Sequence, residues 1–218
     1  MASRHVIAQR LERLRTIIDQ RAGLLVAAMV LGWGLIFAAA AIYKLQAFWM
    51  GFDLGTHEQV LWNTVHGRFA ASSPARGTTS YFGTDIIVTE LLFALPYALW
   101  QRPETLVALQ ALLAPLGAVP LYLLAVRKLG ERWAGVAAAA LYLLALPLQY
   151  ATLYEFQIRI IGGVAFLWAF WALEAGHRWR FALFAALALG SRSEAGFVLA
   201  GLGVYAALQR RGWWWSLG

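Results

Sequence analysis

The sequence has no cysteine among its 218 residues, only four histidines, and few charged residues, which make up 13% of the chain. Disulfides, thiolate metal sites and cysteine nucleophiles are therefore excluded. Charged residues form about a quarter of an ordinary soluble domain, so the low share found here excludes a soluble fold. With so few histidines, we also expect no metal centre built from several of them.

Apolar residues are abundant: 61% of the chain is hydrophobic and the mean hydropathy is +0.61. A membrane-spanning helix needs about 20 mostly apolar residues, and the chain has room for about six or seven such segments. We predict an all-α integral membrane protein, a bundle of six to seven transmembrane or re-entrant helices. These helices would form a single membrane domain over residues 23–218.

Basic residues give the chain a net charge of +7, and they cluster beside the apolar runs. This distribution is typical of cytoplasmic loops that meet anionic lipid headgroups, so we expect membrane lipids and no nucleic acid as partners. Residues 1–22 are predicted to form a basic amphipathic helix on the cytoplasmic surface; a disordered basic arm is the alternative. The N-terminus would then be cytoplasmic in a multi-pass protein of the cell (inner or plasma) membrane.

The longest polar interruption follows the first apolar run, Leu24–Tyr43, and spans residues 44–85. If the N-terminus is cytoplasmic, this segment is an outer loop. Within it, the pattern of Leu54–Val65 predicts a short amphipathic helix whose apolar side lies against the membrane.

The basic clusters at 127–132, 177–180 and 210–211 should share the cytoplasmic side with the N-terminus. That requires an odd number of crossings between Asp85 and Val126, yet two apolar runs, 81–100 and 105–126, lie there. We expect the run that contains Glu90 to be re-entrant or interfacial. The alternative is that the charge rule fails at one loop.

This topology places several ionisable residues on the outer side, where they are costly near the membrane and usually functional. Two arginines among several carboxylates would hold a phosphate, or would simply neutralise the acids. His57 we interpret as a solvated loop histidine; the alternative is a base or a ligand beside Glu58. The set comprises Asp53, Glu58, Asp85, Glu90, Glu155, Arg159, Arg192 and Glu194.

Five stretches carry a family resemblance. They are FDLGTHEQVLWNTVHGR, YFGTDIIVTELLFALPYAL, LQALLAPLGAVPLYLLAVRKLG, LYEFQIRI and SRSEAGFVLAGLGVY. In order and spacing they resemble the predicted membrane proteins called domain of unknown function 2079, over about Phe52–Tyr205. That family in turn resembles the GT-C superfamily of membrane glycosyltransferases, which take sugars from polyprenyl-phosphate donors and place an acidic residue of the first outer loop in the active site.

The resemblance implies that Asp53 is the catalytic residue, as a general base or as a ligand of a divalent cation. It implies substrate binding by Glu58, Asp85, Glu155, Arg159, Arg192 and Glu194. Three polar motifs depart from the family pattern. The family's Gly-Asp-His is Gly83-Thr84-Asp85 here, its Phe-Asp-Phe-His-Pro is the stretch 154–158, and its Lys-Glu-Asp is the stretch 192–194.

Two main hypotheses follow. The first is a GT-C-like glycosyltransferase module that uses a polyprenyl-phosphate sugar donor at the outer face. The second is a non-catalytic accessory or scaffold subunit of a larger membrane complex, favoured by the loss of histidine from two motifs. A transporter is a third possibility, for which Glu90 is the one plausible midplane charge and for which no inverted repeat is visible.

Overall fold

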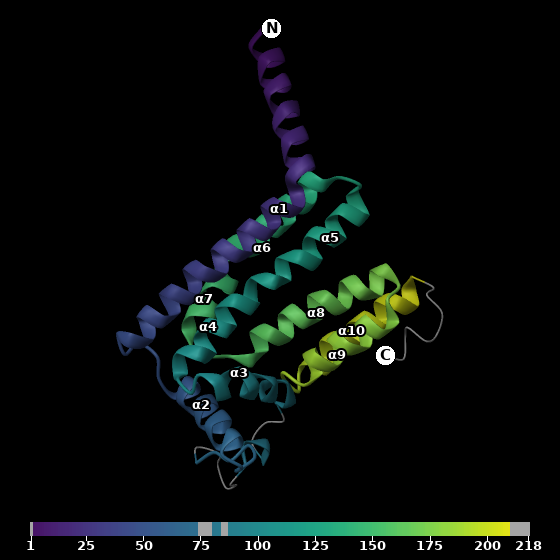
Figure 1. The fold of residues 1–218 in the computed structure, drawn as a ribbon. Coiled ribbons are helices and arrows are strands. Elements are labelled where there is room, and N and C mark those ends of the chain that lie inside the picture. The colour runs from purple at the N-terminus through teal and green to yellow at the C-terminus, as the bar shows by residue number, and fades with distance from the viewer. Residues whose placement is uncertain (1, 74–79, 84–86, 210–218) are drawn as a thin grey trace.

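The computed structural model describes residues 2–73, 80–83 and 87–209, with side chains for Thr16 and from Ile18 onward. In these ranges the chain is helical, and its one extended pairing is an isolated bridge between Ala71 and Ser80. The helices form an elongated bundle, and helix α2 (Phe52–Val65) lies at the end opposite the N-terminus (Figure 1). The all-helical class predicted from the sequence is confirmed for the described residues.

Helix α1 (Ala2–Gln46) is continuous, so no break separates the basic N-terminal segment from the first span. At 1.5 Å per residue, its 45 residues extend for about 68 Å, more than twice the roughly 30 Å thickness of a bilayer core. The apolar part, Ile18–Gln46, is long enough to cross a membrane. The residues before it form the part of α1 that projects beyond the bundle in Figure 1. Their position on a membrane surface stays a prediction.

Two further helical segments have the length and composition of a span. One is Pro103–Leu129, in which α4 (Pro103–Leu113) and α5 (Ala118–Leu129) are joined by the 3-10 turn η3 (Ala114–Gly117). The turn contains Pro115, which explains the break in the α-helix, because proline removes a backbone donor and distorts the α-helical hydrogen-bond pattern. The other is α8 (Ile158–Ala175).

The pair α6 (Arg132–Leu144) and α7 (Leu146–Tyr154) is bent by 45° and would supply a fourth span if it counts as one. The expectation of six to seven membrane segments is therefore met only in part. Besides α2, three remaining helical segments have 12 to 14 residues and are too short to cross a bilayer as regular helices. They are η2 with α3 (Val88–Phe93 and Ala94–Leu99), α9 (Arg178–Leu189) and α10 (Ala195–Leu208). Of the two apolar runs between residues 81 and 126, only the second forms, in the described residues, a helical segment long enough to cross a membrane.

Helix α2 confirms the short helix predicted in the first loop, but its apolar side does not face the membrane. Leu54, Val60 and Leu61 are at most 3% exposed. Two of them pack in a cluster with side chains of η2, α3, α4 and the link before α8. Because α2 is covered by protein on that side, its N-terminal turn is held at a fixed place at the end of the bundle.

Candidate functional site

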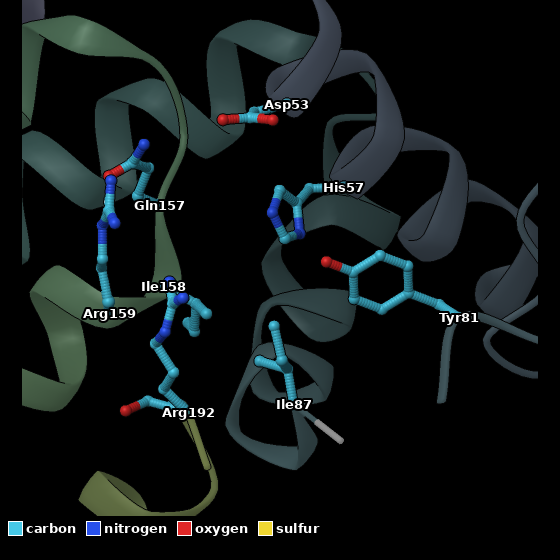
Figure 2. Close-up of a pocket in the computed structure, with 9 residues that line it drawn as sticks. Asp53, His57, Tyr81, Ile87, Gln157, Ile158, Arg159 and Arg192 are labelled. Carbon is cyan, nitrogen blue, oxygen red and sulfur yellow. Dashed lines mark hydrogen bonds between the residues drawn. The ribbon is translucent and has the colours of Figure 1, made fainter. Parts of the chain in front are cut away.

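A polar cavity of about 170 Å³ lies at the end of the bundle where α2 meets three interhelical segments. Figure 2 shows side chains from four parts of the chain turned toward it. The residues around it are Asp53 and His57 of α2, Tyr81, Ile87, the run Gln157, Ile158 and Arg159, and the pair Ser191 and Arg192. The cavity is thus built from segments more than a hundred residues apart in the sequence.

Asp53 occupies the first turn of α2, where the helix dipole favours a negative charge. The helix has no side-chain cap of its own, because Gly51 stands at the N-cap position. Glu155 supplies the missing cap from the α7–α8 link: its Oε2 accepts a hydrogen bond of 3.0 Å from the backbone N–H of Leu54. Glu155 therefore fixes the start of α2, and with it the position of Asp53.

The α7–α8 link is in turn held by Gln110 of α4, whose side chain is fully buried. The Gln110 amide donates to the carbonyls of Thr152 and Glu155, at 3.1 and 2.8 Å, and its oxygen accepts from the N–H of Gln157 at 2.6 Å. The Gln157 side chain accepts a hydrogen bond from Nε of Arg159. The guanidinium of Arg159 is thereby placed on the cavity wall (Figure 2).

The fourth wall is the α9–α10 link. Ser191 donates to the carbonyl of Ala188 at 2.6 Å and lies directly against Gly162 of α8, where a Cβ would overlap its hydroxyl. Arg192 follows, and its Nε is 2.7 Å from a carboxylate oxygen of Glu194. That hydrogen bond holds the pKa of Glu194 below its usual range. Arg192 reaches the cavity, whereas Glu194 is exposed.

His57 stands one helical turn after Asp53, on the same side of α2, and is only 8% exposed. Its Nδ1 is 2.9 Å from Oε1 of Glu90, a carboxylate that is 1% exposed. The expectation that His57 is a solvated loop histidine is therefore wrong. Its ring packs edge-on against Tyr81 and Phe156, and this packing removes it from water.

A second, more open cavity of about 450 Å³ adjoins the first and shares Asp53, Gln157 and Arg159 with it. Its other residues come from α7 and include Tyr150 and Tyr154, whose ring centres are 5.9 Å apart. Asp53 and Arg159 thus border both cavities.

The sequence profile of one family, described as "Predicted membrane protein (DUF2079)", matches residues 41–218. The chain belongs to this family. Neither the curated proteins nor the solved structures contain a match. As a DUF2079 protein with several apolar helices, it is a multi-pass membrane protein.

Of the site residues predicted for this DUF2079 chain, the structure brings together Asp53, Arg159 and Arg192. Glu155 caps α2 and Glu194 pairs with Arg192, so neither borders the cavity. Asp85 lies outside the described residues.

Glu58 also lies away from both cavities. It accepts a hydrogen bond of 3.1 Å from the hydroxyl of Tyr97 in α3. Burial raises the pKa of Glu58 above its usual value, the Tyr97 hydrogen bond opposes this shift, and the charge of Glu104 adds to it.

His57 and Gln157 border the cavity but were not among the site residues predicted from the sequence. The four-residue spacing between Asp53 and His57 was a usable signal, because such residues share one side of a helix. Gln157 carries no comparable signal, since it lies in an extended link between two helices.

The described residues provide more positive than negative charge around the first cavity. Two arginines border it, against the single carboxylate of Asp53. Within the described part of the chain, no three His, Asp or Glu side chains gather as a metal site would require. The residues at hand fit an anion better than a divalent cation.

Proposed function

We propose that this chain is a glycosyltransferase module that moves a sugar from a polyprenyl-phosphate donor to an acceptor hydroxyl. One observation carries the proposal: Asp53 borders two adjoining cavities, and Arg159 and Arg192 border the smaller one. A phosphate fits the smaller cavity, because guanidinium groups match its planar pairs of oxygens. The larger cavity leaves room for the sugar or the acceptor.

In this reaction the acceptor oxygen attacks the anomeric carbon of the sugar, and the bond from that carbon to the phosphate oxygen breaks. The proton of the acceptor hydroxyl passes to the Asp53 carboxylate, which acts as general base. The lipid phosphate leaves with the electron pair of the broken bond. The guanidinium groups of Arg159 and Arg192 stabilise its added negative charge.

The membrane placement belongs to the same proposal. We infer that the N-terminus is cytoplasmic in the cell membrane of a bacterium and that the cavities open at the outer face. The shorter apolar segments Val88–Leu99 and α10, and with them α9, would enter the bilayer from the ends of the bundle. Counted with the longer helices, they give the six to seven membrane segments expected from the sequence. Non-helical backbone at that depth is tolerated where protein covers it or where it borders a water-filled cavity.

The test is sugar transfer in proteoliposomes, with the donor a polyprenyl phosphate carrying a radiolabelled sugar. Asp53→Asn should lower the transfer rate by about 100-fold or more, the range that general bases supply. Glu58→Gln is the matched control, because Glu58 is a carboxylate of the same helix that borders neither cavity. Full turnover in Asp53→Asn would remove Asp53 from the mechanism.

A second function, that of an accessory subunit without catalysis, is favoured by one observation. Two of the acids predicted for the site are engaged elsewhere, Glu155 as a helix cap and Glu194 in a pair with Arg192. Purification in mild detergent, followed by mass spectrometry of protein and lipid, separates the two. A fixed set of other membrane subunits supports the accessory function, whereas a lone chain that carries polyprenyl phosphate supports the enzyme.

A further inference from the structure

The buried pair of His57 and Glu90 plays no part in the reaction described above. Glu90 projects from the 3-10 helix η2 and is the more deeply buried partner. The Nδ1–Oε1 distance of 2.9 Å is that of a hydrogen bond, although the angle departs from the ideal. Among the described residues, neither oxygen of Glu90 has any other partner. A buried carboxylate in this situation needs a positive charge beside it, and His57 is the group placed to supply it.

The direction of the contact determines which ring nitrogen faces the ligand. Nδ1 is the ring nitrogen that lies 2.9 Å from the Glu90 carboxylate, so a proton on that nitrogen faces a negative charge. Nε2 makes no hydrogen bond to any residue that the structure describes. Figure 2 shows the ring at the edge of the smaller cavity, between Asp53 and Tyr81 and opposite Arg192. A proton on Nε2 would therefore be available to a bound molecule.

We propose that His57 is a third cationic contact for the anion in this cavity, and that Glu90 positions its ring and balances its charge. The ligand is an oxyanion. Its assignment as a phosphate ester, rather than as another oxyanion, rests on the proposed function. In the protonated state, Nε2–H donates a hydrogen bond to one ligand oxygen. In the neutral state Nε2 is an acceptor and repels that oxygen, so binding should weaken as the pH rises.

The other ionisable side chains around His57 come from five parts of the fold. They are Asp53 from the same helix, Tyr81 from η1, Glu90 from η2, Arg159 from α8 and Arg192 from the α9–α10 link. Arginine stays protonated, and a tyrosine hydroxyl loses its proton only near pH 10. Of these side-chain types, histidine is the one that ordinarily changes charge between about pH 5 and pH 8.

The experiment uses the full chain in lipid nanodiscs with sulfate as the probe, because the charge of sulfate is constant across this range. Affinity is measured by calorimetry at about pH 5 and pH 9. A hydrogen bond to a charged group corresponds to about tenfold or more in affinity, so sulfate should bind at least about tenfold more tightly at the lower pH. Equal affinity at both values in the unaltered protein would overturn the proposal.

Two substitutions and one control separate the roles. His57→Gln should abolish the pH dependence while leaving the weaker binding of the two arginines. His66 is exposed and lies at the C-terminal end of α2, so His66→Gln should leave the pH dependence of sulfate binding unchanged. Glu90→Gln keeps a hydrogen-bond acceptor but removes the charge that favours the imidazolium, so the fall in affinity should move to lower pH. A pH profile identical to that of the unaltered protein in Glu90→Gln would show that Glu90 is merely structural.

The result is distinguishable from that of the transfer assay, because sulfate binding requires no sugar chemistry. Loss of transfer in every preparation, with pH-dependent sulfate binding intact, would refute the enzyme and keep the anion contact. Active transfer together with pH-independent sulfate binding would support the enzyme and refute the anion contact of His57.

Discussion

Replacing Gln110 by leucine tests whether one buried amide holds the α7–α8 side of the site together. Leucine is close to glutamine in size, so the change removes polar atoms without leaving a large cavity. It strips partners from the carbonyls of Thr152 and Glu155 and from the N–H of Gln157. A buried polar group left without a partner costs about 1–3 kcal/mol. With three polar groups losing this partner, the free energy of unfolding should fall by at least about 3 kcal/mol.

The assay is reversible unfolding in mixed detergent, followed by circular dichroism, with Gln101→Leu as the matched control. Gln101 is exposed, and its replacement should change the unfolding free energy by less than about 0.5 kcal/mol. Sulfate affinity should also drop in the Gln110 variant, because the displaced link carries Arg159. If the two variants are equally stable, the three hydrogen bonds of Gln110 do not hold the link and the reasoning fails.

Three other predictions concern neighbouring parts of the site. Gly162→Ala should destabilise the chain and weaken sulfate binding, because the new methyl group overlaps the side chain of Ser191 in the α9–α10 link. Gly163→Ala is the control, since there is open space around it, and it should change neither property. The free energy of unfolding measures stability, and calorimetry measures sulfate affinity. Glu155→Gln should lower the unfolding free energy by about 0.5–2 kcal/mol through the weaker cap on α2, and an unchanged value would argue against the cap. Glu58→Gln should reduce the loss of stability as the pH rises above about 4.5: because the pKa of Glu58 is raised from that value, its contribution is full at lower pH and is lost as the pH rises through the raised pKa. An identical pH dependence in variant and unaltered protein would contradict this assignment.

Much of the architecture could be predicted from the sequence, because apolar runs and basic clusters reflect the membrane directly. The helix of the first loop was predicted to within two residues of α2. Only three or four of the six to seven predicted segments are, in the described residues, long and apolar enough to cross a membrane as regular helices, because hydropathy alone does not show where helices such as α9 begin and end. Side-chain burial by protein and burial by lipid also give the same pattern, which is why Leu54 was assigned to the membrane surface.

The site was harder to predict, because it depends on which partner each charged residue finds. Asp53, Arg159 and Arg192 were expected on one side and do border one cavity. Glu155, predicted to bind substrate, instead accepts a hydrogen bond from a backbone N–H, and His57, predicted to be solvated, borders the cavity and contacts Glu90. Such pairings join residues far apart in the chain, and the spacing of residues in one sequence does not encode them.

The cap on α2 has a consequence for biosynthesis. Leu54 and Glu155 are separated by 101 positions, and a bacterial ribosome adds about 5–20 residues per second. The first turn of α2 therefore waits about 5–20 s for its cap during translation, while the spans between them are already being inserted. Arg192 emerges later still. The polar cavity consequently assembles only after the helices that precede Arg192, from α1 to α9, have been translated.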